Sequence, residues 1–315
     1  MIEVRSISKF YANKKAVDTL SFEIHEGEIV GLLGLNGAGK STILKMLGCF
    51  LVPSQGDARI GGHSVLENPN AVRKMIGYLP DTPPLYNEMK TRHYLDFVAH
   101  LKNVPHDKVK EFVAIAMQKT QLGEVADARL SELSHGFRQR VGIAQALVHQ
   151  PRVLILDEPI NGLDPIQIVE MRDLVLSLKG QHTVILSSHI LSEITKTCDR
   201  ILVLDRGRLV AEGTESQLRG GASRGLEVML EIEKPTSGMI EAIQNLSGVE
   251  SIREGRRNQQ PVQLLIQCST DLRPEIARIA VESGAAVLSL GKKEAELETL
   301  FLKLVKGEGE GRTHG

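Results

Sequence analysis

The sequence has almost no net charge, few aromatic residues and no cysteine pattern. Its 38 lysines and arginines balance 39 aspartates and glutamates, so we expect no overall electrostatic attraction to nucleic acid. The three cysteines, Cys49, Cys198 and Cys268, lie far apart without metal-type spacing, which indicates a reducing compartment and no disulfide framework. Cys49 and Cys198 lie among apolar residues and are expected to be small core side chains.

Segments that would enter a membrane are also missing. No run approaches the roughly 18 uncharged apolar residues that a spanning helix requires, and the charged N-terminus lacks the apolar stretch of a signal peptide. We therefore expect a chain that does not cross a membrane by itself, although it could still bind to one. A length of 315 residues, 42% of them hydrophobic, favours two domains with full cores.

The segment GLNGAGKST, Gly34 to Thr42, fits the pattern G-x-x-x-x-G-K-[ST]. The apolar run GEIVGLL before it predicts a buried strand, and TILKMLGC after it predicts a helix. Such a strand, loop and helix form a phosphate cradle, because backbone N–H groups and the helix N-terminus point at the anion. We expect Lys40 to reach the β- and γ-phosphates and Ser41 to ligate magnesium. The residues expected to surround the nucleotide here are Gly34, Asn36, Gly37, Ala38, Gly39, Lys40, Ser41 and Thr42.

The segment VLILDEP, from Val153 to Pro159, predicts a buried strand that ends in two acids. Adjacent buried carboxylates are costly unless a cation is close, and in a P-loop protein that cation is magnesium. We expect Asp157 to hold the ion through water. Glu158 should point the other way, because side chains alternate along a strand, and could polarise the attacking water. The alternative is an acidic strand end that caps a helix.

A second strand, in HTVILSSH, ends at His189. Ligands of open α/β sheets bind at the carboxyl ends of the strands, so His189 is expected to donate to a γ-phosphate. We expect the other histidines to be surface residues on helices or in loops. Tyr11 stands out in a chain that is only 3% aromatic and could stack on an adenine ring. An ordinary half-buried strand tyrosine explains Tyr11 equally well.

Between these two parts of the sheet, residues 85–150 are predicted to be mostly helical. Within them, Val141, Ala144, Leu147 and Val148 recur at helical spacing, and Ser134 precedes a helix that should begin near Phe137. This helix start could face a second phosphate. It could also be an ordinary capped helix, which the motif alone does not exclude.

The C-terminal part changes character after a glycine-rich, basic linker at 219–225. Residues 226–306 predict the order β-α-β-β-α-β, which is the ferredoxin-like pattern, with an amphipathic final helix at 294–307. We find no catalytic constellation there and expect a packing or regulatory module. The tail, 307–315, is expected to be disordered.

Together these motifs resemble an ABC-type ATPase subunit over about residues 1–220. Besides the P-loop (Walker A), LSHGFRQR matches the signature, VLILDEP matches Walker B and INGLDP matches the D-loop with Asp164. Asp81 stands at the glutamine-loop position, where it could contact magnesium and nucleotide. His135 stands where the signature usually has glycine, and Phe137 where it usually has glutamine. These departures resemble single-cassette exporter ATPases of the gliding-motility and drug-resistance types.

The resemblance implies an α/β P-loop cassette with a mixed sheet over 1–218, a helical subdomain at about 85–150, and the ferredoxin-like accessory domain. It implies ATP and Mg²⁺ as cofactors, with Ser41, Asp81 and Asp157 at the metal and Lys40, Glu158 and His189 as catalytic groups. Two copies should face head to tail, so that Ser134, Gly136 and Asp164 of one chain approach the ATP of the other.

The expected function is the energising subunit of a separate membrane permease, acting as an exporter from the cytoplasmic face of the membrane. The alternative is a soluble ABC ATPase that acts on the ribosome or DNA. The stretch between Lys40 and Asp157 is too short for a long coiled coil, only one cassette is present, and the net charge is near zero. These features favour the transporter and argue against a nucleic-acid partner.

Overall fold

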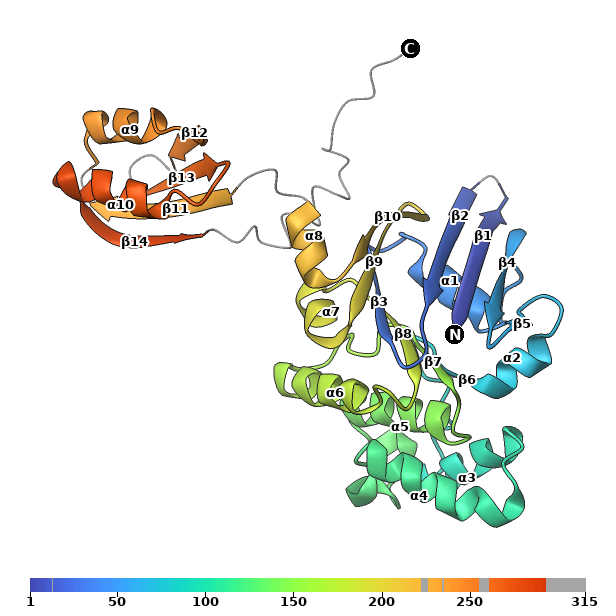
Figure 1. The fold of residues 1–315 in the computed structure, drawn as a ribbon. Coiled ribbons are helices and arrows are strands. Elements are labelled where there is room, and N and C mark those ends of the chain that lie inside the picture. Colours follow the sequence, from blue (N-terminus) through green and yellow to red (C-terminus); the bar gives the residue numbers. More distant parts are fainter. Residues whose placement is uncertain (13, 222–225, 234, 255–260, 293–315) are drawn as a thin grey trace. The chain divides into compact units, whose positions relative to one another are not determined.

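The computed structural model describes residues 1–12, 14–221, 226–233, 235–254 and 261–292. The chain forms two compact units, one from Met1 to Glu215 and another that begins at Ser216 (Figure 1). Both combine helices with sheets, so the predicted α/β class with a small α+β addition is confirmed.

A six-stranded sheet with the order β10-β9-β3-β8-β7-β6 forms the centre of the first unit. It is parallel except that β10 pairs antiparallel with β9. Every residue of β3, β7 and β8 is buried, as expected for parallel strands covered on both faces. The strands are β3 (Ile29–Leu33), β6 (Ile76–Leu79), β7 (Val153–Leu156), β8 (Thr183–Ser188), β9 (Arg200–Asp205) and β10 (Arg208–Gly213).

A second, antiparallel sheet with the order β2-β1-β4-β5 covers the P-loop helix. One hydrophobic cluster joins residues of both sheets to Ile43 and Leu44 of that helix, α1. The bounds are β1 (Ile2–Tyr11), β2 (Lys14–Ile24), α1 (Lys40–Leu47), β4 (Gln55–Ile60), β5 (His63–Ser64) and α2 (Pro69–Met75). The short helix α2 was not predicted from the sequence.

The segment between β6 and β7 is helical, as predicted (green in Figure 1). It contains α3 (Thr91–Leu101), α4 (Val109–Lys119), α5 (His135–Leu147) and three 3-10 turns at His106–Lys108, Gly123–Val125 and Leu130–Glu132. Helix α5 begins two residues before the expected start near Phe137, and its N-cap is Ser134, as predicted. Two further helices complete the first unit, α6 (Pro165–Ser177) and α7 (Leu191–Thr197). Helix α8 (Glu215–Gly221) begins at the last residue of that unit and continues into the second.

The second unit has the predicted order β-α-β-β-α-β. Its antiparallel sheet has the order β12-β13-β11-β14, so the first and third strands are central, as in ferredoxin-like folds. A separate core cluster includes Val228, Leu264 and Ile276. The elements are β11 (Leu226–Glu233), α9 (Ser237–Gln244), β12 (Val249–Glu254), β13 (Val262–Cys268), α10 (Arg273–Glu282) and β14 (Ala286–Lys292).

The boundary between the units differs from the sequence-based prediction. Helix α8 covers residues 219–221, which were expected to belong to the linker, and the division after Glu215 precedes the expected domain end at 218. The remaining linker residues, 222–225, lie outside the described residues, as do the predicted final helix at 294–307 and the tail at 307–315.

Two histidines expected at the surface are enclosed to different extents, His182 fully and His149 in part. His182 is 7% exposed and its Nδ1 lies 2.7 Å from the Pro151 carbonyl oxygen. His149 Nε2 lies 3.0 Å from the Ile76 oxygen, and its buried Nδ1 has no hydrogen-bond partner among the described residues. Because burial and the nearby Lys102 both disfavour the cation, the pKa of His149 is lowered to about 4.

We therefore predict that His149 makes folding sensitive to acid. Its pKa in the unfolded chain is near 6.5, so between pH 6.5 and 4 the unfolded state binds a proton that the folded state excludes. The free energy of unfolding should fall over this range by on the order of 2 kcal/mol from this group. Urea denaturation would give the free energy of unfolding at pH 7 and at pH 4.5. The decrease between these pH values should be smaller for His149→Gln than for the unmodified chain. Equal losses would contradict the prediction.

Candidate active site

The loop between β3 and α1 has a backbone shape that requires glycine. Gly37 and Gly39 have φ angles of +83° and +104°, in the left-handed region that favours glycine. A Cβ on Gly39 would lie 2.8 Å from the Ala16 oxygen, and one on Gly34 would lie 2.7 Å from the Leu204 oxygen. The loop is therefore packed closely on β2 and β9, and α1 begins directly behind it with its N–H groups free for an anion.

Lys40 is the cationic centre of this loop. Its side chain is 6% exposed, and Nζ donates to the Gly34 carbonyl oxygen at 2.6 Å. Glu158 Oε1 lies 3.3 Å from the same nitrogen. A buried ammonium needs such partners because isolated charges are costly away from water. The P-loop and the end of β7 are thus joined through one charge.

Asp157 connects the loop to two neighbouring strands. Its Oδ1 accepts hydrogen bonds from Ser41 Oγ at 3.1 Å and from Ser187 Oγ at 2.7 Å. Burial raises the pKa of Asp157, and the negative charges of Asp81 and Glu158 raise it further. The hydrogen bonds from Ser187 and Ser41 lower the same pKa but do not outweigh burial. A divalent cation at this position would counter that effect. A hydroxyl beside a carboxylate suits Mg²⁺, whose other ligands are usually waters and phosphate oxygens. The described residues hold no group of three or more His, Cys, Asp or Glu that would form an all-protein metal site.

Glu158 differs from Asp157 in its partners. Glu158 Oε2 lies 2.9 Å from His189 Nδ1, while its backbone N–H donates to Ser187 Oγ at 2.9 Å. The expected divergence of the two acids is present, but strand alternation is the wrong reason. Strand β7 ends at Leu156, and Glu158 turns away because its φ is +49°. This left-handed conformation is costly for a glutamate and is held by the surrounding contacts.

Lys40, Ser41, Glu158 and His189 line a cavity of about 590 Å³ at the carboxyl ends of β3, β7 and β8, whereas the expected residues Gly34 and Asp157 do not line it. The structure brings eleven of the expected residues to it: Tyr11, Asn36, Gly37, Ala38, Gly39, Lys40, Ser41, Thr42, Asp81, Glu158 and His189. Tyr11 is 48% exposed at the cavity wall, where Lys9 Nζ lies 5.7 Å from its ring centroid. Tyr11 is the last residue of β1, so its position and exposure agree with a stacking ring and equally with a half-buried strand tyrosine.

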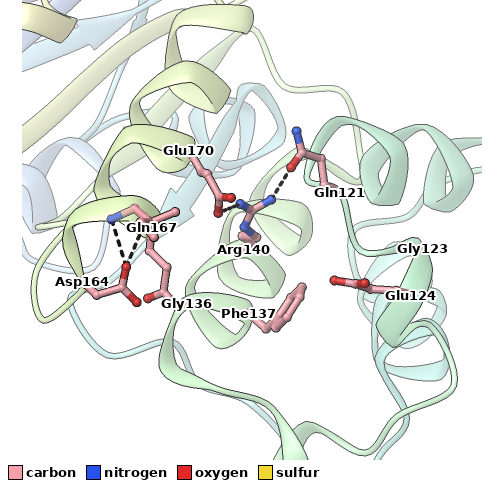
Figure 2. Close-up of a pocket in the computed structure, with 10 residues that line it drawn as sticks. Gln121, Gly123, Glu124, Gly136, Phe137, Arg140, Asp164, Gln167 and Glu170 are labelled. Atoms are coloured by element: carbon pink, nitrogen blue, oxygen red, sulfur yellow. Dashed lines mark hydrogen bonds and ion pairs between the residues drawn. The ribbon is translucent and has the colours of Figure 1, made fainter.

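Ser134, Gly136 and Asp164 do not line the P-loop cavity. Gly136 and Asp164 line another cavity, of about 660 Å³, between α5, α6 and the end of α4 (Figure 2). There Arg140 donates to Gln121 Oε1 at 2.7 Å and to Glu170 Oε2 at 2.6 Å. Asp164 accepts hydrogen bonds from the N–H groups of Ile166 and Gln167, so within one chain it acts as the N-cap of α6.

Comparisons with known proteins identify the relatives of this chain. The family described as ABC transporter matches residues 17–161. The ABC transporter ATP-binding protein YxlF of Bacillus subtilis is 31% identical over 97% of this chain and 99% of its own length. The bacitracin transport ATP-binding protein BcrA of Bacillus licheniformis is 33% identical over 98% of both chains. The chain belongs to the ABC transporter ATP-binding protein family.

Solved structures agree with this assignment. The ATP-binding subunit of an ABC transporter is 30% identical and superposes with a TM-score of 0.64 over 70% of this chain and 92% of that chain. The dimeric cassette MJ0796 with ADP and Pi is 23% identical, with a TM-score of 0.63 over 68% of this chain and 98% of that chain, and supports the fold alone. This ABC protein is an ATPase that binds and hydrolyses ATP. None of its described helices is both long and apolar enough to cross a bilayer.

Several residues of this ABC site were missed from the sequence. Ser187 contacts both Asp157 and Glu158, and it lies two positions before His189, so strand periodicity could have placed it on the same face. Lys14, Ala16, Leu35 and Asn161 also line the cavity. No sequence signal marks them, because their position depends on how β2 and the loop after β7 pack around the P-loop.

We predict that Gly39→Ala damages this ABC site more than Gly37→Ala. Both residues have positive φ angles, but a Cβ on Gly39 would clash with a backbone oxygen, whereas one on Gly37 meets nothing within 4 Å. Gly37→Ala should cost about 1 kcal/mol of strain, and Gly39→Ala should cost about 3 kcal/mol or more. Chemical denaturation and ATP titration would measure both variants. A smaller loss for Gly39→Ala would contradict the packing shown by the structure.

Proposed function

We propose that this chain powers a separate membrane permease, as an exporter, from the cytoplasmic face of the membrane. The observation that carries the proposal is the division of the functional residues between two cavities. Lys40, Glu158 and His189 line the P-loop cavity, whereas Gly136 and Asp164 line the other cavity. A second copy placed head to tail would bring its signature segment to the P-loop of the first, and each ATP would join two chains.

The residues of one chain would then act as follows. Lys40 binds the β- and γ-phosphates, and Ser41 and Asp157 hold Mg²⁺, with Asp81 beside them. The ion would neutralise charge on the phosphate oxygens. Glu158 accepts a proton from the attacking water, and His189, 2.9 Å from Glu158, orients that carboxylate beside the γ-phosphate. Tyr11 stacks on the adenine ring. Ser134 and Gly136 come from the partner chain.

We predict that Glu158→Gln separates binding from turnover. The amide fills the same space but cannot accept the proton, so ATP hydrolysis should fall by roughly 100-fold or more while nucleotide binding persists. Lys40→Ala should lose nucleotide affinity instead, because the phosphate contact goes with the side chain. Isothermal titration and phosphate release would measure these effects. Normal turnover in Glu158→Gln would remove it as the general base, and Glu158→Gln that stays monomeric with ATP in sedimentation would contradict the homodimer.

A groove on the helical subdomain suits the permease. It has a volume of about 660 Å³ and lies between α2, α3 and the loop before α3. Tyr86, Phe97 and Leu101 line it and are 57%, 37% and 63% exposed, and the ring of Tyr86 packs edge-on against Phe97. Arg73, Lys74 and Lys102 lie around the same groove. It would accept a short amphipathic helix that carries apolar and acidic side chains.

We predict that Leu101→Glu weakens membrane attachment without affecting hydrolysis in solution. The new charge would face both the apolar side chains of the groove and an incoming helix. The matched control is Val281→Glu, because Val281 is 66% exposed in the second unit. Tagged variants would be purified from membranes in mild detergent. The yield of a stoichiometric multi-spanning partner should fall by about tenfold or more for Leu101→Glu alone. Recovery of ribosomes or DNA instead would favour the soluble alternative.

A further inference from the structure

His135 makes a contact between two parts of the active-site machinery. It is the first residue of α5, and its Nε2 lies 3.0 Å from the backbone oxygen of Asn161, in the loop after β7. A carbonyl oxygen only accepts hydrogen bonds, so Nε2 carries the proton and donates. The ring also lies beside Gly162, where an added Cβ would be 3.2 Å from Nε2. Among the described residues, this is the only side-chain hydrogen bond between α5 and residues 158–162.

The loop that receives this hydrogen bond positions the general base. The backbone N–H of Asn161 donates to the backbone carbonyl oxygen of Glu158 at 3.1 Å, and both residues line the P-loop cavity. Glu158 and Gly162 both have positive φ angles, +49° and +73°. A loop with this backbone depends on its supports. Ser187 Oγ supports it at Glu158, and His135 supports it at Asn161.

The backbone of His135 belongs to the signature segment, at the start of α5. It lies between Ser134, the N-cap of α5, and Gly136, and both of these are expected at the ATP of the partner chain. A shift of the first turn of α5 would therefore move the imidazole and, through it, the Asn161 carbonyl. Two other contacts, Gln167 against Gly136 and Arg140 with Glu170, hold α5 to α6 (Figure 2). Neither of them involves residues 158–162.

We propose that His135 is a positioning residue that couples the two ATP sites of the dimer. Each chain uses its signature segment at one site and its Glu158 at the other, and His135 joins these two segments within the chain. When ATP fixes the signature segment at the first site, the hydrogen bond to Asn161 stabilises the Glu158 loop at the second. This inference rests on the proposed head-to-tail dimer.

The test is the ATP dependence of hydrolysis by the full chain. His135→Ala removes the donor, and the loss of one hydrogen bond should lower the rate by about fivefold. We expect a Hill coefficient above one for the unmodified chain. In His135→Ala it should fall to about one, because the sites no longer communicate. His135→Gln keeps an N–H donor and should restore both values. His106→Ala, which removes another exposed histidine, is the matched control and should change neither.

Two further measurements separate this role from other effects. ADP affinity measured on the isolated chain should change less than about twofold in His135→Ala, since the P-loop contacts remain. Cooperative hydrolysis in His135→Ala, or a His135→Gln variant as defective as His135→Ala, would overturn the proposal. An original chain that neither dimerises with ATP nor hydrolyses it cooperatively would overturn the dimer itself, and the coupling with it.

Discussion

A buried cation organises the first unit. Lys40 is almost wholly enclosed, and an ammonium in that position must have oxygen partners or the fold would lose several kcal/mol. The partners come from the P-loop, through Gly34, and from the end of β7, through Glu158. Glu158 in turn contacts His189 at the end of β8. The P-loop and the residues that follow β7 and β8 are far apart in the sequence. They are joined here by the contacts of Lys40 and of its partner Glu158.

Local sequence patterns were enough to predict much of this arrangement. The P-loop, the apolar strands and the helical stretch at 85–150 each have a signal within a short window, so their positions were confirmed. The order of the C-terminal elements followed from the same patterns. Asn161 was missed because an asparagine in a turn carries no distinctive signal. Ser187 was missed although its spacing from His189 indicates a shared strand face. Their roles depend on which strands become neighbours in the sheet.

The sequence also indicated the correct residues for a partly wrong reason. Asp157 and Glu158 do point to different partners, but the strand has already ended and the backbone of Glu158 makes the turn. His135 was noted only as a departure from the usual signature glycine. Its contact with Asn161 could not be predicted, because it joins the start of α5 to a loop whose path depends on that same backbone turn.

The left-handed backbone of Glu158 has a consequence for attempts to stabilise the protein. Glycine adopts a φ of +49° without the cost that a glutamate bears, on the order of 1 kcal/mol. Glycine at this position would relieve that backbone strain, but it would also remove an oxygen partner of the buried Lys40 ammonium. The loss of such a partner costs more than the strain. A procedure that selects only for resistance to heat would therefore keep the strained glutamate, and the carboxylate needed for the chemistry would be kept with it.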